Sequence, residues 1–446
     1  MEILHIFCTR TVEKTLGFII IMSKSYLNFG AILVASVLLI GTAIHIYVLA
    51  AIVIGLIGFS ALFYKVLKMK NMNIWFMPYV KHVLSKKKTE KTKHIMFCFV
   101  DHYEPQWGLT TGIGETRIPI TDERTMEQER WRVDQWHTRY PEVAGKHVDA
   151  DGVHPQHSFF YPEEEYRKEH LDKISDLCAR GFGEIEVHLH HDNDTEENLR
   201  KTLSGFTELL HKEHGAFTRN QETGLLNYSF IHGNWTLCNC HPEGKYCGVD
   251  NELTVLKETG CYADFTYPSA PSNTQTAKIN SIYYAGNIEG QSASHAEGIN
   301  VKVGRKESGD LMIIQGPLAL NMKERKKGIL PTIENSDVRS AFPPTKNRVD
   351  LWVETGVQVE DKDDWIFIKI HTHGTQEADL DCLLGDDFDQ MCSYLESKYN
   401  DGKNYALHYV SAREMFNIVK AAEAGEEGNP NKYRDYILPR PTHKKM

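Results

Sequence analysis

The 446-residue sequence lacks glycine-rich phosphate-binding motifs and an excess of basic charge. Neither G-x-G-x-x-G nor G-x-x-x-x-G-K-[ST] follows its first predicted strand, which argues against a nucleotide-binding α/β fold. The formal net charge is −10 at pH 7, which argues against nucleic acid as the main partner. No internal repeat is visible. The 22 histidines are many for this length, so the places where they cluster are the first candidates for metal binding or proton transfer.

A disulfide framework is also absent. The nine cysteines are odd in number and widely spaced, which fits a reducing compartment better than an oxidising one. Only the stretch LCNCHPEGKYC, residues 237–247, is dense in cysteine. Its C-x-C-H spacing lacks the C-x₂-C knuckle and the second ligand pair of common zinc sites. We therefore interpret Cys238, Cys240 and Cys247 as loop cysteines.

Charge is missing altogether from residues 29–64, which follow an N-terminal tail over 1–28. One membrane span needs about 20 apolar residues. The run is too long for one straight span and just long enough for two short ones. A hairpin that turns near Gly41 to His45 and a single long tilted helix both stay open. The run is also too long for a signal-peptide core, so it predicts a retained transmembrane anchor and makes the bilayer a partner.

A basic linker over 65–93 follows this run, with nine lysines against Glu90 alone. Positive charge close to a span tends to stay in the cytoplasm. We therefore predict a protein anchored in the inner or plasma membrane, with its large domain facing the cytoplasm. A lysine-rich linker that ignores the rule is the alternative.

Beyond residue 93, short apolar runs alternate with amphipathic segments. Strands are predicted over 94–100, 184–189, 226–231, 263–267, 311–315, 365–370 and 405–410, and helices over 162–181, 198–215 and 387–402. This alternation predicts parallel β-α units, in a barrel or in an open doubly wound sheet. The length from 94 to about 420 suits a barrel with insertions, in which 272–362 form long loops at the mouth and 421–446 form a C-terminal tail.

Four of the predicted strands end in imidazole and carboxylate groups. These groups are Asp101 and His102, the run from His188 to Asp194, His232 with Asn234 and Trp235, and His371 with His373. Because the carboxyl ends of parallel strands meet on one face, we expect these side chains to lie close together.

The second of these clusters has the spacing of metal ligands. Alternate residues of an extended chain share a side, so His188, His190 and Asp192 point together and His191 points away. Imidazole with carboxylate is a common ligand set for Zn²⁺ and also for Fe²⁺, Co²⁺ or Ni²⁺. The sequence therefore predicts a divalent metal site, with zinc as the first choice.

In the order of these motifs the chain resembles the NodB-homology polysaccharide deacetylases, which are carbohydrate esterases on a (β/α)7 barrel. The resemblance covers roughly residues 90 to 415 and does not rest on close identity. It implies a distorted (β/α)7 barrel over 94–420, placed after the transmembrane segment. FVDH stands where the family has T-F-D-D, which implies Asp101 as the catalytic base and His102 as a metal ligand.

Two further motifs of the family have counterparts with changed residues. HLHHD stands where the family has H-[ST]-x-x-H, which implies His188 as a ligand and leaves His190, His191 or Asp192 as the second. IKIHTH stands where the family has L-x-H, which implies His371 as the catalytic acid, with His373 as its competitor.

The remaining motifs concern the substrate. FIHGNW and DFTYPSAP stand at the third and fourth family positions, which implies that His232, Asn234, Trp235 and Tyr267 bind the substrate. The resemblance implies a metal-dependent hydrolase that removes an N-acetyl or other acyl group from a sugar. With a membrane anchor, the expected carbohydrate substrate is a lipid-linked saccharide or a polysaccharide.

Two other functions stay open. A glycoside hydrolase on a related barrel would need two carboxylates flanking the bond, for which Asp101 with Glu104 or Asp264 are candidates. A catalytically silent, membrane-anchored carbohydrate-binding protein is the other alternative, because the ligand set departs from the family pattern. Glu104 itself either orients His102 or simply ends the strand.

Overall fold

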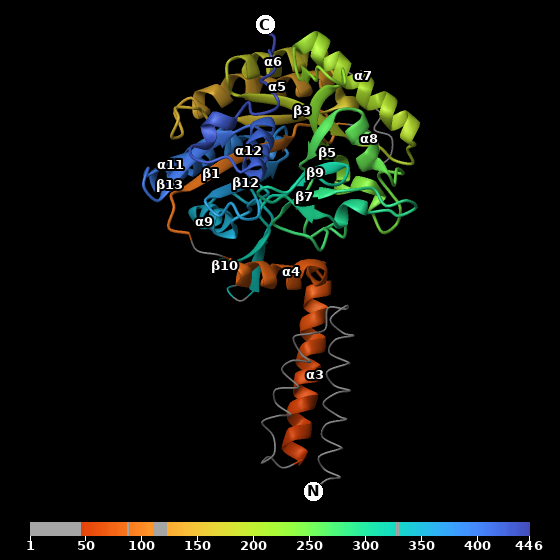
Figure 1. Ribbon diagram of the computed structural model, residues 1–446, viewed down its shortest axis with the longest axis vertical. Coiled ribbons are helices and arrows are strands. Elements are labelled where there is room, and N and C mark those ends of the chain that lie inside the picture. The colour runs from red at the N-terminus through yellow and green to blue at the C-terminus, as the bar shows by residue number, and fades with distance from the viewer. Residues whose placement is uncertain (1–45, 87–88, 110–122, 327, 329) are drawn as a thin grey trace.

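The computed structural model describes residues 46–86, 89–109, 123–326, 328 and 330–446. Helix α3 (Ile46–Lys68) projects from an α/β body, and α4 (Met72–Ser85) lies across the near end of that body (Figure 1). Trp75 of α4 is fully buried in a small apolar cluster with Ala270 and Leu318, which joins this helix to the body. The predicted N-terminal tail over 1–28 lies outside the described residues.

The predicted membrane anchor over 29–64 is contradicted. Residues 29–45 lie outside the described residues, and 46–64 belong to α3, whose last turn carries Lys65 and Lys68. Among the residues that the structure describes, no helix is both long and apolar enough to cross a membrane. The described helix contains only the second part of the uncharged run and continues into charged residues. The membrane location and the cytoplasmic-facing domain depend on that anchor and are contradicted with it.

One large, mostly parallel sheet organises the body. Its hydrogen-bonded order is β12-β1-β2-β3-β5-β6-β9-β7-β8, and β13 pairs with the first half of β1 beside β2. The strands are β1 (Lys93–His102), β2 (His157–Pro162), β3 (Gly183–Leu189), β5 (Leu226–His232), β6 (Cys261–Asp264), β7 (Ile282–Ala285), β8 (Ile299–Asn300), β9 (Leu311–Ile314), β12 (Trp365–Thr372) and β13 (Tyr405–Val410). The short β4 (Thr218–Arg219) pairs with β5, and β10 (Ala319–Lys326) pairs with β11 (Leu330–Glu334) in a separate hairpin.

The sheet does not close, so the predicted (β/α)7 barrel is wrong. From β12 to β9 every pair is parallel, as the alternation of strands and helices predicted. Beyond β9 the ladder changes direction, because β7 runs antiparallel to β9 and β8 runs antiparallel to β7. Among the described residues the ladder ends at β8 and does not return to β12. A barrel needs its last strand to pair with its first, and the described residues show no pairing between β8 and β12.

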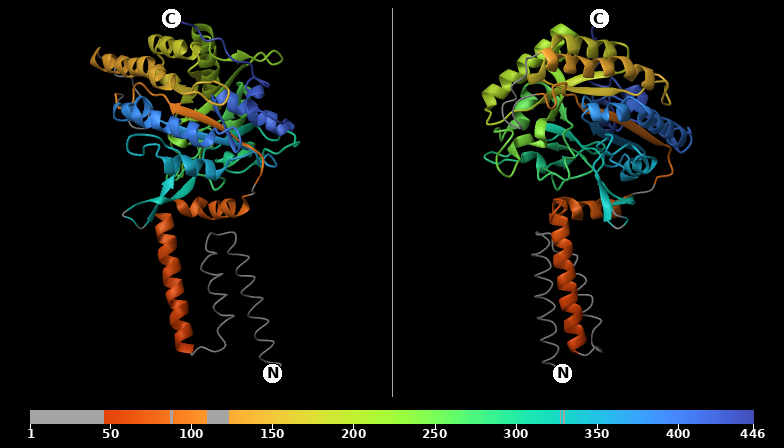
Figure 2. Two further views of the ribbon diagram at one scale, coloured as in Figure 1. Left: turned by 90° about the vertical axis from the view of Figure 1, so that its left-hand side faces the viewer. Right: turned by 180° about the vertical axis from the view of Figure 1, so that it is seen from behind.

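Helices cover both faces of this sheet. They are α5 (Glu123–Ala144), α6 (Lys168–Ala179), α7 (Glu196–His214), α8 (Glu252–Glu258), α9 (Lys346–Thr355), α10 (Leu380–Leu383), α11 (Asp386–Tyr399) and α12 (Ala412–Ala424). Helices α5, α6 and α7 lie together at one side of the body (Figures 1 and 2). Helix α7 begins where the Thr195 side chain accepts the Asn198 N–H and ends at Gly215, whose φ of 69° is left-handed.

Strand β1 shows why the parallel strands are apolar along their whole length. Phe97 and Phe99 enter the larger core, with side chains of α5, α6, α7 and α11. Met96, Cys98 and Val100 alternate with them and enter the second core, with side chains of α12. A strand that is buried on both faces has no polar side, which explains its nearly continuous apolar sequence.

The seven predicted strands correspond to β1, β3, β5, β6, β9, β12 and β13, but other elements were missed. Strand β2, HSFFYP, is short and ends in proline. Helix α5 is mostly polar and contains Pro141, which hides its apolar stripe. Residues 272–362, predicted as loops apart from the strand that became β9, also contain β7, β8, β10, β11 and α9. Residues 421–446, predicted as a tail, complete α12 and then pack on the body, where Leu438 and His443 are buried.

Candidate functional site

Four histidines surround one buried carboxylate at the carboxyl edge of β1, β3 and β12. The Glu104 cluster consists of Glu104, His102, His188, His190 and His373. His102 is the last residue of β1, His188 lies in β3, His190 follows β3 by one residue, and His373 follows β12. The parallel order β12-β1-β2-β3 brings these strand ends to one edge, as the sequence predicted.

Glu104 lies at the centre of the cluster. Its Oε1 is 3.1 Å from Nε2 of His188 and 3.4 Å from Nε2 of His190. Ligand atoms of His102, Glu104 and His373 also lie within 4.8 Å of one another. Two ligands that bind one zinc ion tetrahedrally at about 2.0–2.1 Å lie about 3.3 Å apart. The separations between Glu104 and the two imidazoles therefore match the edges of a tetrahedral metal site.

Hydrogen bonds behind His188 and His190 fix the tautomers of both rings. Nδ1 of His188 donates to the carbonyl oxygen of Ile231 at 2.7 Å, and Nδ1 of His190 donates to Oε1 of Glu164 at 2.6 Å. When such a ring is neutral, it turns a bare Nε2 toward Glu104. A bare nitrogen that faces a carboxylate oxygen is repelled by it unless a proton or a metal ion lies between them. Backbone carbonyls and carboxylates behind histidine are typical of metal-binding rings.

The charges of the cluster favour a cation. Burial opposes ionisation of Glu104, but the facing rings of His190 and His188 outweigh it and lower the pKa of the carboxyl group. Burial, and then the neighbouring rings of His373 and His188, hold the pKa of His102 well below its usual value. The cluster is thus a carboxylate among imidazoles, with His190 and His373 on its partly exposed side.

The two residues predicted as catalytic lie apart from the centre of this cluster. Asp101 is fully buried, and its oxygens face the Gly374 N–H at 2.6 Å and Nε2 of His157 at 2.9 Å. His371 is also buried, with its ring centroid 6.3 Å from that of His102. Burial, followed by Lys369 and His373, lowers the pKa of His371 well below its usual value. This lowering favours the neutral ring over the protonated acid that was predicted.

The structure brings three of the four predicted metal ligands together and separates the fourth. His102, His188 and His190 belong to the Glu104 cluster. One oxygen of Asp192 accepts the Tyr246 N–H at 2.6 Å and the other accepts the Asn193 side chain at 3.3 Å, so this carboxylate holds a loop. The chain leaves the extended conformation after Leu189, where β3 ends, and the expected alternation of side chains stops there.

The predicted substrate-binding residues have different surroundings. The Trp235 ring is half-buried beside the cluster, 6.1 Å from the rings of His102 and of His373. Asn234 precedes it in a left-handed conformation with φ of 55°. Tyr267 is fully buried and donates its hydroxyl to the Trp235 carbonyl at 3.2 Å, so it supports that loop from behind. His232 is fully buried and its Nε2 faces Glu252 rather than the Glu104 cluster.

Sequence reasoning missed the central place of Glu104 and the support from Glu164. Glu104 had a signal, because it follows a buried strand that ends in Asp101 and His102. Glu164 had none, because it is one of three successive glutamates at a predicted helix start, in the turn Glu163–Glu165. Only the fold places this turn beside His190.

Gly233 holds His190 in place by having no side chain. A Cβ on Gly233 would lie 2.2 Å from Cδ2 of His190, inside van der Waals contact. We expect Gly233→Ala to displace the ring and to lower any activity that depends on the Glu104 cluster about a hundredfold, since a misplacement of about 1 Å has that cost. Metal content and turnover would be measured beside Gly205→Ala, whose added Cβ on α7 meets nothing within 4 Å. Unchanged metal content in Gly233→Ala would exclude this steric role.

No protein-family model matches this chain, and no curated protein matches it. The resemblance to the deacetylases therefore stays a prediction from motif order. The argument for function rests on the geometry of the Glu104 cluster.

Proposed function

We propose that this protein is a metal-dependent hydrolase that removes an N-acetyl group, or another acyl group, from a sugar in a saccharide or polysaccharide. The observation that carries the proposal is the Glu104 carboxylate, which faces Nε2 of both His188 and His190 while their Nδ1 atoms are bonded elsewhere. The resemblance to the polysaccharide deacetylases supports the same activity.

The residues fit a divalent metal. One carboxylate and two imidazoles are a ligand set of catalytic zinc sites, and Fe²⁺, Co²⁺ and Ni²⁺ use the same donors. Glu104, His188 and His190 would hold the ion, while the Ile231 carbonyl and Glu164 orient the two rings. At such a site the metal polarises a carbonyl oxygen and lowers the pKa of a water molecule.

His373 is the side chain best placed to hold a proton during the reaction. Its half-exposed ring stacks on that of His102 at a centroid distance of 4.6 Å. A half-exposed imidazole at a cluster edge is able to accept a proton from water and return it to a leaving amine. Both oxygens of Asp101 are already bonded, so we assign Asp101 to positioning the loop at Gly374.

Two tryptophans flank His373 and suit a sugar ring. The Trp107 ring is 5.6 Å from the His373 ring, and its side chain is 40% exposed. The Trp235 ring lies 6.1 Å away on the half-buried loop after β5. Broad aromatic faces offer apolar contact to the C–H surface of a sugar, which would place the acyl group over the cluster.

A glycoside hydrolase is less well supported. That reaction needs two carboxyl groups facing each other across the substrate, about 5–10 Å apart. Asp101 and Asp264 are both fully buried. Asp264 binds the backbone and hydroxyl of Thr266 with its two oxygens. Neither carboxylate faces an opening.

The test is an assay of the purified full-length chain on N-acetylated oligosaccharides, with free acetate and new amine as readouts. We expect acetate release that stops on chelation and returns with Zn²⁺ or Co²⁺. Acetate release that survives complete metal removal would overturn the mechanism. New reducing ends without acetate would indicate a glycoside hydrolase, and saccharide binding without either product would indicate a silent binding protein.

A further inference from the structure

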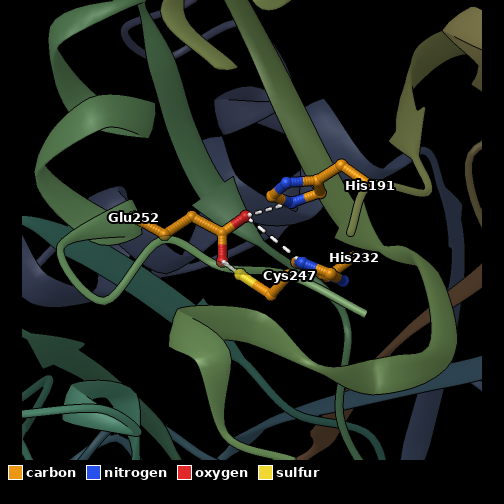
Figure 3. A group of neighbouring side chains, drawn as sticks. All are labelled: His191, His232, Cys247 and Glu252. Atoms are coloured by element: carbon orange, nitrogen blue, oxygen red, sulfur yellow. Dashed lines mark hydrogen bonds and ion pairs between the residues drawn. The ribbon is translucent and has the colours of Figure 1, made fainter. Parts of the chain in front are cut away.

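A second group of ligand-type side chains lies behind the Glu104 cluster. The Cys247 cluster consists of His191, His232, Cys247 and Glu252 (Figure 3). These residues come from the loop after β3, the end of β5, the loop after Asn239 and the first turn of α8. Their ligand atoms all lie within 4.8 Å of one another. The side chains of His191 and Glu252 are 7% and 0% exposed, and His232 and Cys247 are fully buried.

Three distances from the Glu252 carboxylate to the other side chains fall in the range of the edges of a tetrahedral zinc site. Oε1 of Glu252 is 3.2 Å from Nε2 of His191 and 3.4 Å from Nε2 of His232. Oε2 of Glu252 is 3.5 Å from Sγ of Cys247. Zinc bonds nitrogen or oxygen at about 2.0–2.1 Å and sulfur at about 2.3 Å. In a tetrahedral site, two nitrogen or oxygen ligands then lie about 3.3 Å apart, and such a ligand lies about 3.5 Å from a sulfur ligand.

The imidazoles are also held in the orientation that metal binding requires. Nδ1 of His191 bonds Oδ2 of Asp194 at 3.0 Å, and Nδ1 of His232 donates to the Gly233 carbonyl at 2.5 Å. Nε2 of His232 is buried and has no hydrogen-bond partner among the described residues, although it points at Glu252. A buried ring nitrogen without a partner is costly unless something fills the space before it.

We propose that the Cys247 cluster is a structural zinc site. Four protein ligands leave no open position, and burial of the cluster keeps substrate away, as in sites that hold a fold together. The ion would join the loops after β3 and β5 to α8. Because His191 follows His190 and His232 precedes Gly233, it would also fix the backbone on which the Glu104 cluster is built. The proposal stands on its own geometry and does not depend on the reaction.

The thiolate makes this site distinguishable from the Glu104 cluster, which contains no cysteine. The full-length chain would be loaded with Co²⁺ alone and its spectrum recorded. We expect a thiolate-to-cobalt charge-transfer band in the native chain and in Glu104→Gln. In Cys247→Ser we expect the band to be lost, and about one metal equivalent per chain to be lost with it. Cys240→Ser is the matched control, since Cys240 lies in the same loop but bonds the Trp235 carbonyl and Tyr267.

A native chain that binds cobalt without the band would overturn the proposal, as would a Cys247→Ser chain that keeps the band. If Cys247→Ser does not fold, zinc-edge X-ray absorption of Glu104→Gln decides the question. One sulfur at about 2.3 Å from the zinc supports the site, and a shell of nitrogen and oxygen alone rules it out. Loss of hydrolysis with the band intact would affect only the proposed function.

Discussion

Glu104→Gln is expected to lower acetate release about a thousandfold and to remove the metal of the Glu104 cluster. The substitution keeps the size of the side chain and removes the charge that faces Nε2 of His188 and His190. Metal ions supply several kcal/mol of transition-state stabilisation, and about 4 kcal/mol corresponds to a thousandfold in rate. The measurements are turnover with saturating Zn²⁺ and metal content after dialysis.

Glu164 and Glu163, which are neighbours in one turn, provide a variant with a smaller expected loss and a control with none. Glu164→Gln weakens the hydrogen bond to Nδ1 of His190, so we expect a loss of about 10–100-fold in metal affinity. Glu163→Gln changes an adjacent side chain outside the cluster and is expected to leave turnover unchanged. Equal losses in all three variants would point to a general effect on folding. Full activity of Glu104→Gln would remove the centre of the proposed site.

The parallel part of the fold was predictable from the sequence, whereas its edge was not. Strands such as β1 and β12 are buried on both faces and are therefore apolar throughout, which marks them clearly. The barrel prediction was wrong because closure depends on long-range pairing. Strands β7 and β8 are only four and two residues long, and nothing in them shows that they run antiparallel.

The candidate site was predictable at its strand ends and not beyond them. His102, His188 and His190 were found because parallel strands end at one edge. Asp192 was grouped with them by extending a period of two past Leu189, where the strand stops, and the structure places its carboxylate on the Tyr246 N–H instead. Glu252 lies in the Cys247 cluster although it follows His191 by 61 residues, a pairing that only the tertiary fold sets.

Arg413→Met is expected to destabilise the protein by about 3–5 kcal/mol, because it leaves a buried carboxylate without its partner. Arg413 is 4% exposed, and its guanidinium bonds both oxygens of Glu184, at the start of β3, at 2.7–3.1 Å. It also donates to the carbonyl oxygens of Arg434 and Leu438, so it ties the C-terminal segment to α12. The measurement is the free energy of unfolding in denaturant.

The matched control is Arg305→Met, since Arg305 pairs with Glu360 at 3.7 Å and both side chains are about 40% exposed. Exposed pairs of this kind contribute about 0–1 kcal/mol, so this variant should unfold almost as the native chain does. Adding Glu184→Gln to Arg413→Met removes the unpaired charge, and we expect it to recover part of the lost stability. No recovery would mean that the cost comes from the freed carbonyl groups of the C-terminal segment. A loss below about 1 kcal/mol for Arg413→Met would show that water reaches Glu184 and that the ion pair does not hold the segment in place.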